Sequence, residues 1–148
     1  MLFRSIVLIG PIQDERVLEL LKTSSVRDRI LAVGESPEAV SAMQGFDVFV
    51  MPSRSEGLCR ALIEAGTVGI CPIVSDAGGM KELVRHGVDG WVFSKEDSAR
   101  LQQAMRESLG NPALREHYAV SVAKHVPTLC AAERVADRML KIYSRLTN

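Results

Sequence analysis

The chain has 148 residues with 18 basic and 18 acidic side chains, so its formal net charge at pH 7 is zero. This length is sufficient for one hydrophobic core, and we expect residues 1–148 to form a single domain. The balanced charge excludes the broad basic field by which proteins hold nucleic acid. It leaves room for local binding of an anion by backbone amides at the start of a helix.

Cysteine usage and hydropathy favour a cytoplasmic protein. Cys59, Cys71 and Cys130 are odd in number and widely spaced, which is typical neither of a disulfide framework nor of a zinc site. The N-terminal apolar run has the length of a strand and lacks a small-residue cleavage site, so we do not expect a signal peptide. No apolar stretch approaches the length of a membrane span.

Short apolar runs alternate along the chain with longer segments of helical periodicity. We expect strands at residues 5–10, 29–34, 47–51, 71–75 and 91–93. We expect helices at about 14–24, 37–44, 59–68, 81–85 and 97–109, another from residue 112, and a last one at about 131–145. Strands that are apolar on both faces and alternate with helices predict an α/β fold, a Rossmann-like parallel sheet with helices on both faces and a helical C-terminus.

The spacing of apolar residues indicates which side of each helix packs. The expected faces are Val17, Leu18, Leu20 and Leu21 in the first helix, Val40 and Met43 pointing inward from the second, and Val135, Met139, Ile142 and Leu146 along the last.

The loop after the third predicted strand carries the candidate chemistry. Ligands of parallel sheets bind beyond the carboxyl ends of the strands, and here a strand is followed by Gly57 and then by the start of a helix. The unpaired amides and positive dipole end of that helix suit a diphosphate. Glu56 and Glu64 bracket the helix start, and carboxylates accept charge-assisted hydrogen bonds from hydroxyls. The pattern indicates a nucleotide-sugar site, with ribose at one end and hexose at the other.

The run SEGLCRALIEAGTVGICPIVSDAGGMKELVRHGVDGWVF resembles the donor-binding, C-terminal domain of retaining glycosyltransferases with the GT-B fold, of the group 1 or family 4 type. The resemblance includes the Glu-x7-Glu signature from Glu56 to Glu64, FDVFVMPS before it, SDAGGMKE and HGVDGWVF after it, and GNPALREHY near the end. The upstream stretches IVLIGP and VRDRILAVGES resemble the second and third strands of that domain. Nearly the whole chain therefore resembles half of a GT-B fold.

The resemblance implies roles for the candidate residues. Glu56 would be the catalytic residue, contacting hydroxyls of the transferred sugar, and Glu64 would grip the ribose. The rest of the implied donor-binding set is Gly57, Leu58, Cys59, Arg60 and Ala61, with the amides of Leu58 and Cys59 near the sugar and those of Arg60 and Ala61 facing the diphosphate. The family implies hexose transfer with retention from a UDP- or GDP-linked donor, in polysaccharide or glycolipid biosynthesis. It needs no metal ion and no protein nucleophile, because the donor phosphate takes the acceptor proton.

Two parts of the family's machinery have no counterpart in this sequence. The first is a strand and loop that supply an Arg and a Lys to the phosphates, for which we find no segment before Ser5. Because that strand is central in the family's sheet, we expect either a gap or a rearranged pairing. The second is the acceptor-binding domain. Losing one preorganised donor group typically costs ~10²–10³ in rate, so the chain alone is expected to be inactive.

The missing parts leave several functions open. The chain could be a donor domain that works with an acceptor-binding domain. The alternatives are a sugar-nucleotide-binding or interaction module, a subunit of a split glycosyltransferase, and a degenerate domain that binds nothing tightly. The family's final helices pack partly against the other domain, so we expect exposed apolar surface here, suited to homodimerisation. Peripheral membrane association would go through the absent domain.

Each candidate residue also has an ordinary structural interpretation. Glu64 could pair with Arg60 at i, i+4 on a solvated helix face, worth ~0.2–0.5 kcal/mol. The ordered series of motifs favours the binding role for both glutamates. Cys59 is more consistent with a small spacer than with a nucleophile, and Trp91 with a core position than with a stacking platform.

Overall fold

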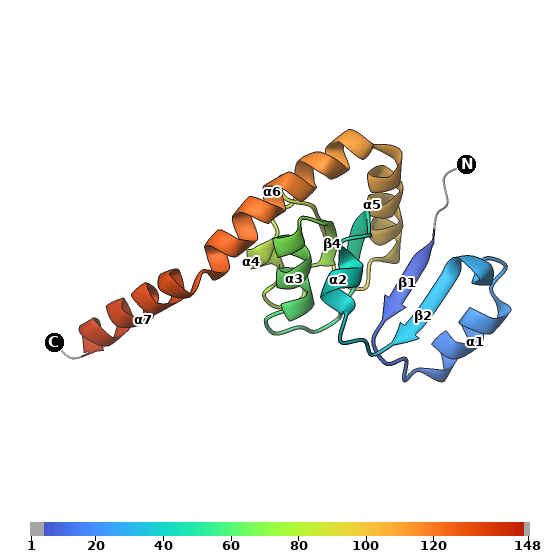
Figure 1. The fold of residues 1–148 in the computed structure, drawn as a ribbon, viewed down its shortest axis with the longest axis horizontal. Helices are drawn as coiled ribbons and strands as arrows, with labels where there is room; N and C mark the ends of the chain where they lie inside the picture. Colours follow the sequence, from blue (N-terminus) through green and yellow to red (C-terminus); the bar gives the residue numbers. More distant parts are fainter. Residues whose placement is uncertain (1–4, 147–148) are drawn as a thin grey trace. The chain divides into compact units, whose positions relative to one another are not determined.

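The computed structural model describes residues 5–146, which fall into two compact units (Figure 1). The boundary between them along the chain lies between Ala42 and Met43. The segment considered for a signal peptide begins with residues 1–4, which lie outside the described range. The single domain expected for residues 1–148 stays a prediction. Each unit is described separately below.

The first unit pairs two strands in parallel. It contains β1 (Ile6–Ile9), α1 (Glu15–Thr23), the short 3₁₀ helix η1 (Arg27–Arg29) and β2 (Ile30–Gly34). The ladder runs from Ile6 opposite Ile30 to Ile9 opposite Gly34. Asp14 caps α1 by accepting a hydrogen bond from the Arg16 amide, as its position before a helical run predicts.

Burial in the first unit is weaker than the sequence predicts. Val17, Leu18 and Leu20 on α1 remain exposed, as do Leu31 and Val33 on β2. Residues 31 and 33 lie on one face of the strand because side chains alternate. A two-stranded sheet with a single nine-residue helix offers too little surface to cover both of its faces. Within this unit, the strand face that carries Leu31 and Val33 is left exposed.

The second unit is built on a three-stranded parallel sheet in the order β3-β4-β5. Its strands are β3 (Val48–Met51), β4 (Cys71–Ser75) and β5 (Trp91–Phe93). Among the described strands, no ladder joins β1 or β2 to this sheet. The rearranged pairing, one of the two outcomes expected for the absent first strand, is not seen among these strands.

Helices cover both faces of β4, the central strand. They are α3 (Arg60–Val68), α4 (Met80–Leu83), α5 (Ser98–Gly110) and α6 (Pro112–Cys130). Ile73 packs with the cluster that includes Ala104 of α5 and Tyr118 of α6, whereas Val74 packs with Leu62 of α3 and Met80 of α4. All five residues of β4 are buried, which explains why its apolar run carries no polar alternation.

Two shorter helices depart from their expected form. The helix α2 (Ala39–Met43) buries Met43 against Ala65 and Ile70, but Val40 is exposed although it was expected to point inward. A helix of five residues makes little more than one turn, so only a narrow side of it can face a core. Met43 lies on that side. The helix predicted over residues 81–85 is a single turn, because the backbone becomes extended at Val84.

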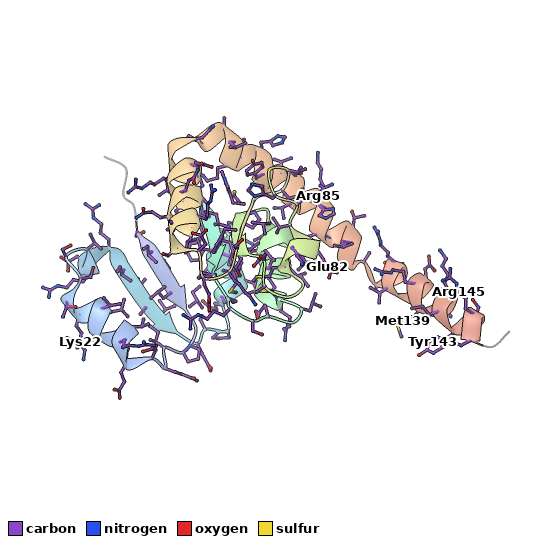
Figure 2. All side chains as sticks on the ribbon, turned by 180° about the vertical axis from the view of Figure 1, so that it is seen from behind. Lys22, Glu82, Arg85, Met139, Tyr143 and Arg145 are labelled. Carbon is purple, nitrogen blue, oxygen red and sulfur yellow. The ribbon has the colours of Figure 1, made fainter. Side chains whose placement is uncertain are left out.

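The last helix, α7 (Ala132–Leu146), has no buried residue. Its apolar side chains Val135, Met139, Leu140, Ile142 and Leu146 are exposed. Figure 1 shows α7 continuing beyond the end of α6, and Figure 2 shows Met139 and Tyr143 on one side of it, with Arg145 on another. The exposed apolar surface expected at the C-terminus is present.

Candidate donor site at the start of α3

The predicted site lies between the end of β3 and the first turn of α3. The chain leaves the sheet after Met51, passes through residues 52–58, and enters α3 with extended backbone at its N-cap, Cys59. The first α-helical bond runs from the Ile63 amide to the Cys59 carbonyl, at 3.2 Å. The amides of residues 60–62 therefore precede the helical ladder and carry the positive end of the helix dipole.

Glu56 lies next to the cap of this helix. Burial raises the pKa of the Cys59 thiol, the amides of Leu62 and Ala61 oppose that effect, and the adjacent Glu56 carboxylate raises the pKa further. Glu56 itself is half-buried. The side chain of the predicted catalytic residue therefore lies beside the Cys59 thiol at the N-cap of α3.

Glu64 lies one turn further along α3. Its Oε1 is 3.9 Å from Nη2 of Arg60, and its side chain is 35% exposed. Both glutamates therefore adjoin the first turn of the helix. The ion pair with Arg60 is the ordinary interpretation of Glu64, but the Arg60 side chain is 88% exposed, so its solvent-screened pairing contributes little stability. The geometry accommodates both interpretations, and the binding role stays a prediction.

The other predicted donor-binding residues leave one side of the helix start open. Leu58 is 67% exposed, Gly57 is exposed, and no atom lies within 4 Å of where a Cβ at Gly57 would be. Ala61 is half-buried, and Cys59, only 2% exposed, belongs to the core cluster with Leu62. Burial and a raised pKa keep the Cys59 thiol protonated, which agrees with a spacer.

The loop after β4 contributes contacts that the sequence analysis missed. In the sequence, Gly78 and Gly79 precede the helix predicted at about 81–85. In the structure the Gly79 amide donates to the Gly57 carbonyl at 3.2 Å, and the hydroxyl of Ser75 donates to the Ser53 carbonyl at 2.6 Å. The available signal was the glycine pair in the loop that follows the buried strand β4, because glycine permits a close approach of two backbones.

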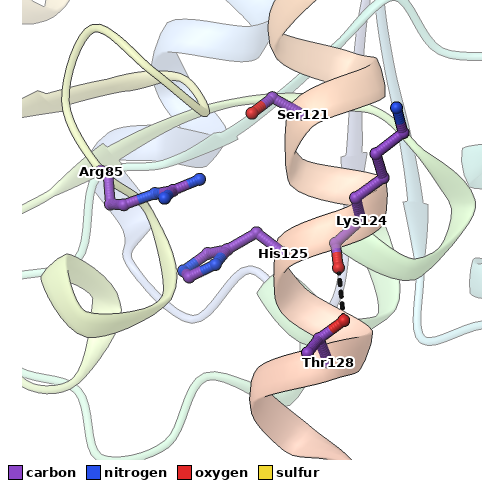
Figure 3. A pocket seen from close by; sticks show the side chains of 5 residues that line it. All are labelled: Arg85, Ser121, Lys124, His125 and Thr128. Atoms are coloured by element: carbon purple, nitrogen blue, oxygen red, sulfur yellow. Dashed lines mark hydrogen bonds between the residues drawn. The ribbon is translucent and has the colours of Figure 1, made fainter.

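Two hollows of the second unit lie elsewhere. One of about 310 Å³ opens between the loop after α4 and α6, lined by Arg85, Ser121, Lys124, His125 and Thr128 (Figure 3). Its arginine is already engaged by the buried Asp89. Another, of about 720 Å³, lies beside β5 and α5. Neither is lined by Glu56 or Glu64, so neither bears on the predicted donor site.

Within residues 5–146, no three His, Cys, Asp or Glu side chains gather in a way that could ligate a metal ion. Metal independence itself stays a prediction. Nor does any helix in the same range combine the length and the hydropathy needed to cross a bilayer.

A parallel sheet with helices on both faces is the architecture of a Rossmann-like domain. The family model described as "Glycosyl transferases group 1" matches residues 4–125. The chain belongs to this family, as its motifs predicted.

Among curated proteins, the chain is similar to the lipopolysaccharide core biosynthesis mannosyltransferase LpcC of Rhizobium leguminosarum bv. viciae. The two are 31% identical over 123 residues, which is 83% of this chain and 35% of the relative. This chain therefore spans about a third of the length of that relative.

Solved structures show the fold. Anabaena Alr3699/HepE in complex with UDP matches with a TM-score of 0.85 at 17% identity, over 96% of this chain and 41% of that one. The C-terminal domain of a glycosyl transferase group 1 family protein (LpcC) from Francisella tularensis matches with a TM-score of 0.75 at 19% identity, over 85% of this chain and 69% of that one. The predicted fold class, one half of a GT-B fold with a helical C-terminus, is confirmed.

Proposed function

We propose that this chain binds the donor substrate, a nucleoside-diphospho-hexose, and serves hexose transfer with retention when it is combined with an acceptor-binding domain. The observation that carries the proposal is the first turn of α3, entered through the exposed Gly57 and Leu58, with Glu56 beside its cap and Glu64 one turn further on. Open amides attract a diphosphate, and two flanking carboxylates accept hydroxyl protons in hydrogen bonds.

Each group then has one task. The amides of Arg60 and Ala61 bind the diphosphate, Glu64 accepts hydrogen bonds from the ribose hydroxyls, and Glu56 accepts them from the hexose, near the amides of Leu58 and Cys59. Donors pre-aimed at the leaving diphosphate stabilise the charge that develops as the glycosidic bond breaks. The buried, protonated Cys59 is not suited to attack the sugar, which supports transfer without a protein nucleophile.

The similar proteins support a nucleotide sugar as the donor. The Anabaena protein is described in complexes with UDP and with UDP-glucose, and the Rhizobium relative is named a mannosyltransferase. We therefore propose a UDP- or GDP-linked hexose, used for polysaccharide or glycolipid synthesis. The free cysteines support a cytoplasmic location.

The exposed apolar face of α7 supports the proposal that the chain works with a partner domain. A stripe of large apolar side chains on a helix with no buried residue is the kind of surface that another domain covers. We propose that an acceptor-binding domain covers it. The second candidate, a donor-binding subunit beside a separate acceptor-binding chain, uses the same face. A homodimer is the competing occupant, and sedimentation of the chain with and without the acceptor domain distinguishes them.

The direct test is thermal melting of the chain with UDP and with GDP. Ligand at a hundred times its dissociation constant stabilises the folded state by ~2.7 kcal/mol, so one nucleotide should raise the melting temperature. Glu64→Ala should abolish that rise, and Glu82→Gln, which changes an exposed carboxylate on α4, should keep it. If neither nucleotide nor its hexose conjugate shifts the transition, the donor-binding function is wrong.

A further inference from the structure

The loop that carries Glu56 is attached to the loop after β4 at three consecutive places. The Ser75 hydroxyl, at the buried end of β4, donates to the Ser53 carbonyl at 2.6 Å. The Gly79 amide donates to the Gly57 carbonyl at 3.2 Å. Between these bonds, the backbone of Gly78 lies directly against the peptide group of Glu56.

The contact at Gly78 requires glycine for two separate reasons. Its φ is +53°, a left-handed conformation that side chains with a Cβ rarely adopt. A Cβ there would also lie 1.7 Å from the Glu56 carbonyl oxygen and 2.7 Å from its carbonyl carbon. Both obstructing atoms are backbone, so any larger residue must displace the Glu56 peptide or its own loop.

The far side of this loop is anchored as well. The Asp76 amide donates to the Phe93 carbonyl at 2.8 Å, and the Asp76 carboxylate accepts from the Lys95 amide at 2.8 Å. The loops after β4 and β5 are thus joined before Gly78 is reached. The loop after β4 is thus held from two sides, by the loop after β5 and by the Glu56 loop.

We propose that Ser75, Gly78 and Gly79 are positioning residues that fix the Glu56 carboxylate relative to the first turn of α3 and so determine how the site recognises the hexose of its donor. The inference rests on the proposed function. It assigns to the loop after β4 a selective effect: displacement of Glu56 weakens contact with the sugar. Glu64 and the α3 amides, which hold the nucleoside diphosphate, are expected to keep their places, because Leu62 also anchors α3 against Val74 of β4, on which Gly78 does not lie.

The test uses isothermal titration of the whole chain with two probes, UDP and UDP-glucose, or GDP and GDP-mannose if the first pair does not bind. In Gly78→Ala the affinity for the sugar nucleotide relative to the bare nucleotide should fall roughly tenfold, the size expected when a hydrogen bond to a charged group is lost. Affinity for the bare nucleotide should change by less than about twofold. Ser75→Ala should shift the ratio in the same direction, by about threefold, because the loop loses one bond and keeps its space.

Gly87→Ala is the matched control. Gly87 also has a left-handed φ, +75°, but no atom lies within 4 Å of its added Cβ. It carries the same backbone strain without the contact, and it should leave the ratio unchanged. In a Glu56→Ala background, Gly78→Ala should have no further effect on the ratio, because its action passes through Glu56.

The outcomes separate the two ideas. A wild-type chain that binds neither pair of probes contradicts the proposed function, and the positioning role fails with it. Suppose instead that the wild-type chain binds, but Gly78→Ala and Ser75→Ala leave the ratio of the two affinities unchanged, either by weakening both probes equally or by affecting neither. That result overturns the positioning role alone. If Gly78→Ala does not fold by circular dichroism, Ser75→Ala and Gly79→Ala decide the question. A Cβ at residue 79 would lie 3.2 Å from the Gly57 oxygen, a tight contact but a far milder one than the 1.7 Å approach at residue 78.

Discussion

Nη2 of Arg85 donates to Oδ1 of Asp89 at 2.7 Å, across the turn that precedes β5. Asp89 is fully buried, and its carboxylate also accepts from the Arg85 amide and from the Ser121 hydroxyl of α6. One carboxylate thereby joins the turn to the longest helix of the second unit. Burial alone would raise the pKa of Asp89, but these hydrogen bonds outweigh it and lower the pKa from 3.8 to about 2.

This carboxylate predicts an acid-sensitive contribution to stability. Because the folded-state pKa lies below the unfolded value of 3.8, the contribution is fully present above that value and is lost as the pH falls through about 2. We expect ~1–2 kcal/mol, reduced from the full linkage value because Arg85 is half exposed to solvent. Urea unfolding of Asp89→Asn, followed by the fluorescence of the single tryptophan, Trp91, should show this loss at pH 7. The free energy of unfolding of Asp89→Asn should also fall less steeply with decreasing pH below about 4. The exposed substitution Glu116→Gln should change neither the stability at pH 7 nor this pH dependence.

The two glutamates should separate the two halves of a donor. Glu64→Ala is expected to weaken UDP and UDP-glucose alike, by ~10–100-fold, because the ribose is common to both ligands. Glu56→Ala is expected to weaken only UDP-glucose, because its partner is the hexose. Titration calorimetry measures all four affinities, and equal effects of the two variants on both ligands would contradict the assigned roles.

Much of the second unit can be predicted from sequence because its signals are local. The strands Cys71–Ser75 and Trp91–Phe93 have the predicted bounds, since each is a short apolar run between turn residues. Burial is not local. Periodicity predicts that Val17 and Leu20 lie on the same side of a helix, but it does not predict whether another element covers that side. In the structure, both side chains are exposed.

The candidate site shows the same division. The open start of α3, with Glu56 and Glu64 beside it, follows from spacing along one segment. The bond from Ser75 to Ser53 and the contact of Gly78 with Glu56 join loops more than twenty residues apart, and no spacing rule encodes them. They depend on the register of β3 against β4, which places Met51 opposite Val74. The loops that follow these two strands therefore begin side by side at the carboxyl edge of the sheet.

A matched pair of leucines tests the core under the site. Leu62 is 0% exposed beneath the first turn of α3, whereas Leu58 is 67% exposed just before it. Leu62→Ala should lower the free energy of unfolding by ~2–5 kcal/mol, because it leaves a cavity among Val74, Met80 and their neighbours. Leu58→Ala should stay within ~0.5 kcal/mol of wild type. Denaturant titration compares them, and similar losses would mean that the loop before α3 packs more tightly than described.

The cysteines should differ in reactivity in the order of their burial. Burial raises the pKa of Cys71 to about 12, against the opposing charge of Arg115, and burial also raises the pKa of Cys59. Cys130 is half-buried at the end of α6. Iodoacetamide at pH 8 should therefore modify Cys130 first, with Cys59 and Cys71 at least ~10-fold slower, since the thiolate is the reactive form. Mass spectrometry of native and urea-unfolded protein measures this, and rapid labelling of native Cys59 would contradict its role as a buried spacer.

The exposed face of α7 makes a prediction about the isolated chain. Ile142 and Leu146 lie on one side of a helix without a buried residue, so replacing both by Asp removes apolar surface from water without opening the core. We expect the double variant to bind less of a hydrophobic dye such as anilinonaphthalene sulfonate, with a free energy of unfolding within about 1 kcal/mol of wild type. It should also lose affinity for an added acceptor-binding domain. The matched control is Arg134→Asp together with Arg138→Asp, which changes the polar side of the same helix and should retain dye binding. A large loss of stability in the apolar variant would mean that this face is already packed within the chain, and that its partner is not another domain.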